Sequence, residues 1–132
     1  MSQDKKVRIE SDLLGSREIP ADALYGVQTL RGVENFPISH FHLNEYPLFI
    51  KGLAITKMGA AAANHELGLL SDELYNAIMQ ACDEVAEGKH YKEFPVDMIQ
   101  GGAGTTTNMN ANEVIANRAL QIMGYECGDF KH

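Results

Sequence analysis

One segment constrains the fold more than any other: the run PLFIKGLAITKMGAAAANHELG at residues 47–68. Pro47 suits the first turn of a helix, where its missing N–H costs nothing, and Gly68 is typical of a helix end. The residues between them are apolar around much of the helix circumference, and Ala60 to Ala63 would let a second helix approach closely. This surface needs helical partners, so we expect a mainly α fold.

A second helix is expected from Ser71 to Gly88. Ser71 supplies a capping hydroxyl, and the acids Asp72 and Glu73 suit the positive end of a helix dipole. Gly88 is the expected C-cap. The buried face follows the i, i+3, i+4 spacing of an amphipathic helix and consists of Leu74, Ala77, Ile78, Ala81 and Val85.

A last helix is expected to begin near Thr106 and to run to Met123, with Gly124 closing it. Its apolar stripe consists of Ala111, Ile115, Ala119 and Ile122. The polar stripe opposite consists of Asn110, Glu113, Asn117 and Gln121. Asn110 points away from the loop and can simply be solvated, and Arg118 is expected to form an ion pair or an interface contact.

The N-terminal part predicts smaller elements. Val7 and Ile9 alternate with charged residues, as in a strand, Gly15-Ser16 is a turn signal, and the chain can return antiparallel until Pro20. Residues 22–36 predict one or two helical turns, which Pro37 ends. The expected fold is therefore a small N-terminal β-hairpin followed by short helical turns and three longer helices, forming one domain of residues 1–132.

Composition excludes several classes of function. The formal net charge is 11 − 18 = −7 and there is no run of Lys or Arg, which argues against nucleic acid or an anionic membrane as a partner. No apolar run approaches the ~20 residues that span a bilayer, and the N-terminus has no signal-peptide pattern. Cys82 and Cys127 lack CxxC spacing, so a disulfide scaffold or zinc site is not expected and a cytoplasmic location fits.

The segment GGAGTTTNMNAN at residues 101–112 is the strongest candidate for a binding site. Glycines let the backbone approach a ligand, and three threonines follow at a helix start, where free N–H groups and the dipole attract anions. The spacing fits neither a P-loop nor a dinucleotide fingerprint. No lysine follows, which favours a carboxylate over a polyphosphate. A capped Gly-rich loop that binds nothing is equally compatible with this pattern.

Other polar residues carry weaker signals. Asn108 and Asn112 are spaced i, i+4 beside the apolar stripe, where each can brace the loop or face a ligand. Arg31 has the side chain best shaped to clamp a carboxylate, although a surface or subunit contact is the commoner role. His40 and His42 have no further metal ligands nearby, so no metal site is expected. The adjacent acids Asp83-Glu84 indicate solvated charge on a helix surface.

Two longer motifs resemble a known family. The stretch RIESDLLGSREIPADALYGVQTLRGVENFPIS is similar to the N-terminus of aspartate ammonia-lyases, and QGGAGTTTNMNANEVIANRA resembles the first signature segment of the aspartase/fumarase superfamily. Class II fumarases typically have WGAQTQRS where this chain has YGVQTLRG, and GSGTQTNMN where it has GAGTTTNMN. Both differences favour the aspartase branch.

The resemblance implies a fold, a reaction and a set of residues. The fold is the N-terminal domain of the aspartase/fumarase type, and the reaction is reversible deamination of L-aspartate to fumarate and ammonia, without a cofactor or metal. Thr105 would bind substrate, with Gly104, Thr106 and Asn108 beside it or supporting it. Arg31 and Asn112 are the two further candidates. The cytoplasmic enzyme would be a homotetramer.

The family's later signatures, T-H-x-Q-D and G-S-S-x-M-P-x-K-x-N, do not occur in this sequence. The second of these carries the catalytic serine base, so no catalytic residue is expected in this chain. We expect an N-terminal lyase domain without its helical-bundle and C-terminal domains, inactive in isolation. The alternatives are a fumarase-like or other superfamily lyase fragment, or a standalone carboxylate-binding or assembly module.

Overall fold

The computed structural model describes residues 6–131, which begin with the expected hairpin. Strand β1 (Val7–Asp12) pairs antiparallel with β2 (Gly15–Pro20), so that Val7 lies opposite Pro20. Gly15 turns the chain with a φ of 109°, which a residue with a side chain rarely adopts. Ile19 is fully buried in a small apolar cluster with Ala23 and Val27. The hairpin is thus anchored by one face of its second strand.

Three longer helices follow the expected bounds. Helix α2 is Pro47–Glu66, α3 is Asp72–Ala86 and α4 is Thr105–Ile122. Short 3-10 turns lie between them: η1 at Leu43–Glu45, η2 at Tyr91–Glu93 and η3 at Gly102–Gly104. The Ser71 hydroxyl accepts a hydrogen bond from the backbone N–H of Leu74, as its position predicts. The mainly α fold is confirmed.

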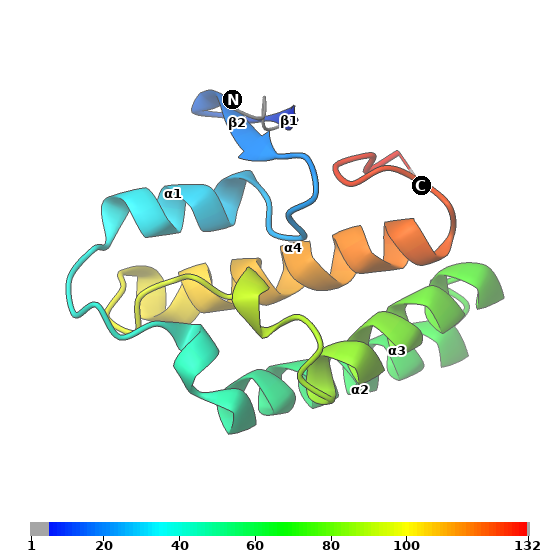
Figure 1. The fold of residues 1–132 in the computed structure, drawn as a ribbon. Coiled ribbons are helices and arrows are strands. Elements are labelled where there is room, and N and C mark those ends of the chain that lie inside the picture. The colour runs from blue at the N-terminus through cyan, green and yellow to red at the C-terminus, as the bar shows by residue number, and fades with distance from the viewer. Residues whose placement is uncertain (1–5, 132) are drawn as a thin grey trace.

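Helix α4 crosses the middle of the molecule, with α1 on one side and the α2–α3 pair on the other (Figure 1). The main core lies between α2, α3 and α4. Its largest fully buried apolar side chains are Phe94, Leu43, Ile50, Val85, Val96 and Val114. Because α4 lies between these elements, it packs against both α1 and the α2–α3 pair.

Helix α1 (Val27–Asn35) is longer than the one or two turns expected from its sequence. Two carboxylates from distant segments hold its start. Glu113 on α4 accepts hydrogen bonds from the N–H groups of Gly26, Gln28 and Thr29 and from the Thr29 hydroxyl, at 2.9, 2.8, 3.0 and 2.6 Å. Glu10 accepts the N–H of Val27 at 2.9 Å. The unpaired donors of this helix start are therefore satisfied by side chains that no local pattern indicates.

The polar stripe of α4 is mostly buried, and the interpretation of Asn110 as a solvated residue is wrong. Asn110, Glu113 and Asn117 are buried, and only Gln121 is exposed. Glu113 caps α1, Asn110 donates to the Glu93 carbonyl at 2.8 Å, and Asn117 donates to the Leu24 carbonyl at 2.8 Å. Backbone polar groups of other segments line this side of α4 and give these side chains hydrogen-bond partners, although Oδ1 of Asn110 has none among the described residues.

Helix α2 keeps a broad exposed side within the described chain. Leu48 and Ile55 are 82% and 54% exposed, and a Cβ added at Gly52 or Gly59 would meet nothing within 4 Å. Only Ile50, Ala54 and Ala61 of α2 are buried. The expected covering of this helix is therefore only partly supplied by residues 6–131. Over the same residues, no helix is long and apolar enough to cross a membrane.

The Asp83-Glu84 pair on α3 is not simply solvated charge. The Glu84 carboxylate accepts hydrogen bonds from Arg118 Nε and Nη2 on α4, at 2.5 and 2.9 Å, and lies 2.8 Å from His90 Nε2. Hydrogen bonding from Arg118, partly opposed by burial, lowers the pKa of Glu84 to about 2. The ion pair expected for Arg118 is confirmed, and it joins α3 to α4.

This ion pair predicts a pH dependence. The pKa of Glu84 is lower in the folded than in the unfolded protein, so its contribution to stability is present above the unfolded pKa and is lost as the pH falls toward about 2. We expect Arg118→Met to lower the urea midpoint at neutral pH, and the difference from wild type to shrink below pH ~4. Midpoints measured by circular dichroism from pH 7 downward test this, and a difference that is constant with pH would contradict it.

Candidate functional site

The Gly-rich loop before α4 has an uncommon backbone. Gly102, Ala103 and Gly104 have consecutive positive φ values of 73°, 52° and 85°. Glycine adopts such values readily, but Ala103 does so at a cost, and strained residues of this kind cluster at ligand sites. Successive N–H groups in turn conformations can form a concave anion site. The backbone of this loop therefore suits the anion-binding role expected from its sequence.

The three threonines at the start of α4 have different environments. Thr105 is exposed, and its hydroxyl donates a hydrogen bond to the carbonyl of Gly102. Thr106 is half-buried against α1, where its Cγ2 would lie 2.4 Å from a Cβ added at Gly32. Thr107 is buried, and its N–H donates to the Gln100 side chain at 2.7 Å. Thr105 is thus the threonine whose side chain is open to a ligand.

Asp97 organises the segment before the loop, and sequence reasoning missed it. Its buried carboxylate accepts hydrogen bonds from the Ser39 hydroxyl and from the N–H groups of Ser39, His40 and Ile99, at 2.6–2.8 Å. Burial opposes ionisation, but the hydrogen bonds from Ser39, Ile99 and His40 outweigh it and hold the pKa of Asp97 well below its usual range. Asp97 accepts the N–H of Ile99, two residues later, which forms an Asx-turn. An Asp just before a Gly-rich loop is the sequence signal that could have indicated this turn.

A positive charge lies beside Asn108 of α4, although no lysine follows the loop in the sequence. Lys57 on α2 donates from its Nζ to Oδ1 of Asn108 at 2.7 Å, and Asn108 is exposed. Helix α2 packs beside α4 and brings the Lys57 ammonium to Asn108. An ammonium group here strengthens the case for an anionic ligand.

The two further candidate residues, Arg31 and Asn112, make their contacts away from the Gly-rich loop. The Arg31 guanidinium binds the Asp12 carboxylate through two hydrogen bonds, of 2.7 and 2.6 Å, and also donates to the carbonyl of Gly15. These contacts tie the hairpin to α1, and the hydrogen bond from Arg31 lowers the pKa of Asp12 to about 2. Asn112 is half-buried, with only a long contact to the sulfur of Met109 at 3.9 Å.

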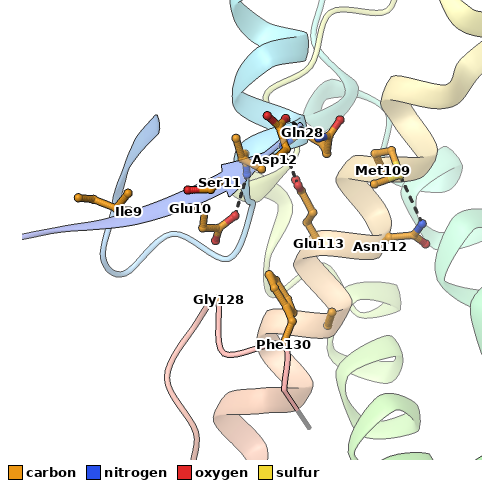
Figure 2. Close-up of a pocket in the computed structure, with 12 residues that line it drawn as sticks. Ile9, Glu10, Ser11, Asp12, Gln28, Met109, Asn112, Glu113, Gly128 and Phe130 are labelled. Atoms are coloured by element: carbon orange, nitrogen blue, oxygen red, sulfur yellow. Dashed lines mark hydrogen bonds between the residues drawn. The ribbon is translucent and has the colours of Figure 1, made fainter. Parts of the chain in front are cut away.

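A groove of about 450 Å³ lies between the hairpin, α4 and the C-terminal segment. Figure 2 shows the carboxylates of Glu10, Asp12 and Glu113 around it, with Phe130 at its edge. Of the six candidate residues, only Asn112 lines this groove. These three carboxylates already accept hydrogen bonds from within the chain. No Lys, Arg or His of the described chain lines the groove to bind a dicarboxylate, so the loop remains the better candidate. No group of three or more metal-ligating side chains occurs within residues 6–131.

Comparison with known proteins places the chain in a family. The sequence pattern of the family described as lyase matches residues 15–132. The chain belongs to this lyase family. It is 53% identical over 132 residues to an aspartate ammonia-lyase of Pseudomonas fluorescens, covering 100% of this chain and 28% of that protein. It is 59% identical over 124 residues to an aspartate ammonia-lyase of a Bacillus species, covering 94% and 26%. The resemblance stated from the two motifs is confirmed.

Solved structures agree with the fold. A Brucella melitensis protein described as fumarate lyase:delta crystallin superposes with a TM-score of 0.94 at 51% identity, covering 96% of this chain and 29% of that one. A class II fumarase from Schistosoma mansoni superposes with a TM-score of 0.81 at 38% identity, covering 92% and 26%. The chain thus spans less than a third of the length of the curated relatives it matches.

Proposed function

We propose that this chain supplies one carboxylate-binding wall of an aspartate ammonia-lyase, which converts L-aspartate reversibly to fumarate and ammonia. The observation that carries the proposal is the loop of consecutive left-handed residues, Gly102–Gly104, which leads into a helix start with an exposed Thr105. In this assignment Gly104, Thr105, Thr106 and Asn108 are the substrate-binding residues. Lys57 adds positive charge beside them.

The arrangement suits the chemistry of this elimination. Removal of a proton from C3 of aspartate places additional charge on one carboxylate, and donors fixed around that group lower the barrier. A helix start with its positive dipole end provides such donors. Neither the loop nor the groove presents a free side chain that we assign as the base. We therefore propose that the base lies outside this chain and that these residues bind and stabilise.

The assembly and location of the complete protein also belong to this proposal. We place it in the cytoplasm as a homotetramer. Support for assembly comes from the broad exposed side of α2, with Leu48 and Ile55 in the open, because large apolar patches commonly mark interfaces. Cys82 and Cys127 are both free thiols, which is compatible with a reducing compartment.

The proposed reaction is tested by assaying the complete gene product, because the chain spans only part of its relatives. We expect fumarate to form from L-aspartate, with equimolar ammonia, and little or no fumarate from L-malate. Ultraviolet absorbance follows fumarate, and a coupled assay follows ammonia. Turnover of malate without turnover of aspartate would contradict the proposal and favour a fumarase instead.

A further inference from the structure

The start of α4 has no side chain of its own to cap it. Gly104 occupies the N-cap position and makes no side-chain hydrogen bond. The first N–H groups of a helix have no partner within the helix, so each must bond elsewhere. One of them, the buried N–H of Thr107, donates to Oε1 of Gln100 at 2.7 Å. A residue from the far side of the Gly-rich loop therefore acts as the cap.

Both polar atoms of the Gln100 side-chain amide form hydrogen bonds. Its Nε2 donates to the carbonyl of Asp97 at 2.8 Å, and the Asp97 side chain is itself held by Ser39, His40 and Ile99. The amide thus links the first turn of α4, at Thr107, to Asp97 on the other side of the loop. Residues 101–104, which lie between these two points, are exposed.

We propose that Gln100 is a positioning residue for the carboxylate site, an inference that rests on the proposed function. By accepting from the Thr107 N–H, it satisfies one donor of this helix start without a charged group. The exposed Thr105 hydroxyl is then the donor that a ligand can use, by displacing its bond to the Gly102 carbonyl. A carboxylate in the same place would also cap the helix, and negative charge is favourable at a helix start. A second negative charge would, however, repel an anionic substrate. A neutral amide provides the acceptor without that charge.

Two substitutions in the complete gene product separate the capping of α4 by Gln100 from the effect of its neutral charge on substrate binding. Gln100→Met keeps the side-chain length but removes both hydrogen bonds, so we expect faster amide hydrogen exchange in the peptide spanning residues 100–110. We also expect kcat/KM for aspartate to fall about tenfold, the equivalent of one lost contact. Gln100→Glu keeps the acceptor for the Thr107 N–H but loses the donor to the Asp97 carbonyl. Exchange should therefore quicken less than in Gln100→Met, while KM for aspartate rises about tenfold or more through charge repulsion.

Ser71→Ala is the matched control, because it removes a helix cap from α3. It should speed exchange in α3 and leave kcat/KM unchanged. A Gln100→Glu variant with the KM of the unmodified protein would overturn the inference, as would unchanged exchange in Gln100→Met. Failure of the unmodified protein to turn over aspartate would contradict the proposed function alone, because the exchange measurement reads the Gln100 contact without substrate.

Discussion

Glu113→Gln is expected to lower the free energy of unfolding by about 2–4 kcal/mol, although the change replaces one oxygen by a nitrogen. The Glu113 carboxylate accepts four hydrogen bonds at the start of α1. An amide has one acceptor oxygen, so at least one of the four donors is left facing an NH2 group. The remaining bonds also lose their charge assistance, which roughly halves their strength.

Urea unfolding followed by circular dichroism measures this loss. Glu73→Gln is the matched control, because Glu73 is an exposed carboxylate in the first turn of α3. Its loss should be about 0.5 kcal/mol, as for most surface changes. Equal losses for the two variants would show that Glu113 contributes no more than a surface charge does. Faster hydrogen exchange confined to α1 in Glu113→Gln would locate the effect at the capped helix start.

Thr105→Ala is expected to lower kcat/KM for aspartate in the complete gene product by about 10- to 100-fold, since a hydrogen bond to a charged group contributes about 1.5–3 kcal/mol. In the structure the Thr105 hydroxyl donates to the Gly102 carbonyl. Binding a carboxylate requires it to exchange that bond for one to the ligand. Because both groups are exposed, water can replace the lost contact, and stability should change little.

Two companion variants make this result specific. Thr105→Ser keeps the hydroxyl and should retain most of the activity. Ser16→Ala removes an exposed hydroxyl of the hairpin that bonds the Ser11 hydroxyl, so it should leave kcat/KM unchanged. Steady-state rates of fumarate formation provide the measurement. If Thr105→Ala keeps the wild-type kcat/KM, Thr105 is a structural residue of the helix start and not a substrate ligand.

Local sequence signals were sufficient to predict the long helices and the Gly-rich loop. Pro47 marks the start of α2, Ser71 caps α3, and positive-φ glycines follow both helices at Gly68 and Gly88. Each of these signals acts within about one turn of the residue that carries it, because it depends on backbone hydrogen bonds between near neighbours. The Gly-rich loop before α4 could be located from sequence for the same reason.

The surroundings of the candidate site required the tertiary structure. Thr105 and Asn108 follow from the motif, but Lys57 reaches Asn108 only because α2 packs beside α4. Arg31 has the chemistry of a carboxylate clamp, and in the fold that chemistry is directed at Asp12 of the hairpin. Gln100 and Asp97 gave no clear signal, since their roles depend on which backbone groups the loop brings to them.

The sequence by itself determined the mainly α class, the bounds of the three long helices, the family and the Gly101–Asn112 segment. Only the tertiary structure decided which polar residues are buried. Glu113 lies on the polar stripe of α4, yet it caps a helix whose N-cap residue, Gly26, lies 87 residues earlier in the chain. Spacing along a helix shows which side chains share a face. It does not show whether that face meets water or the unpaired backbone groups of a distant segment, and that difference decides the role of a polar side chain.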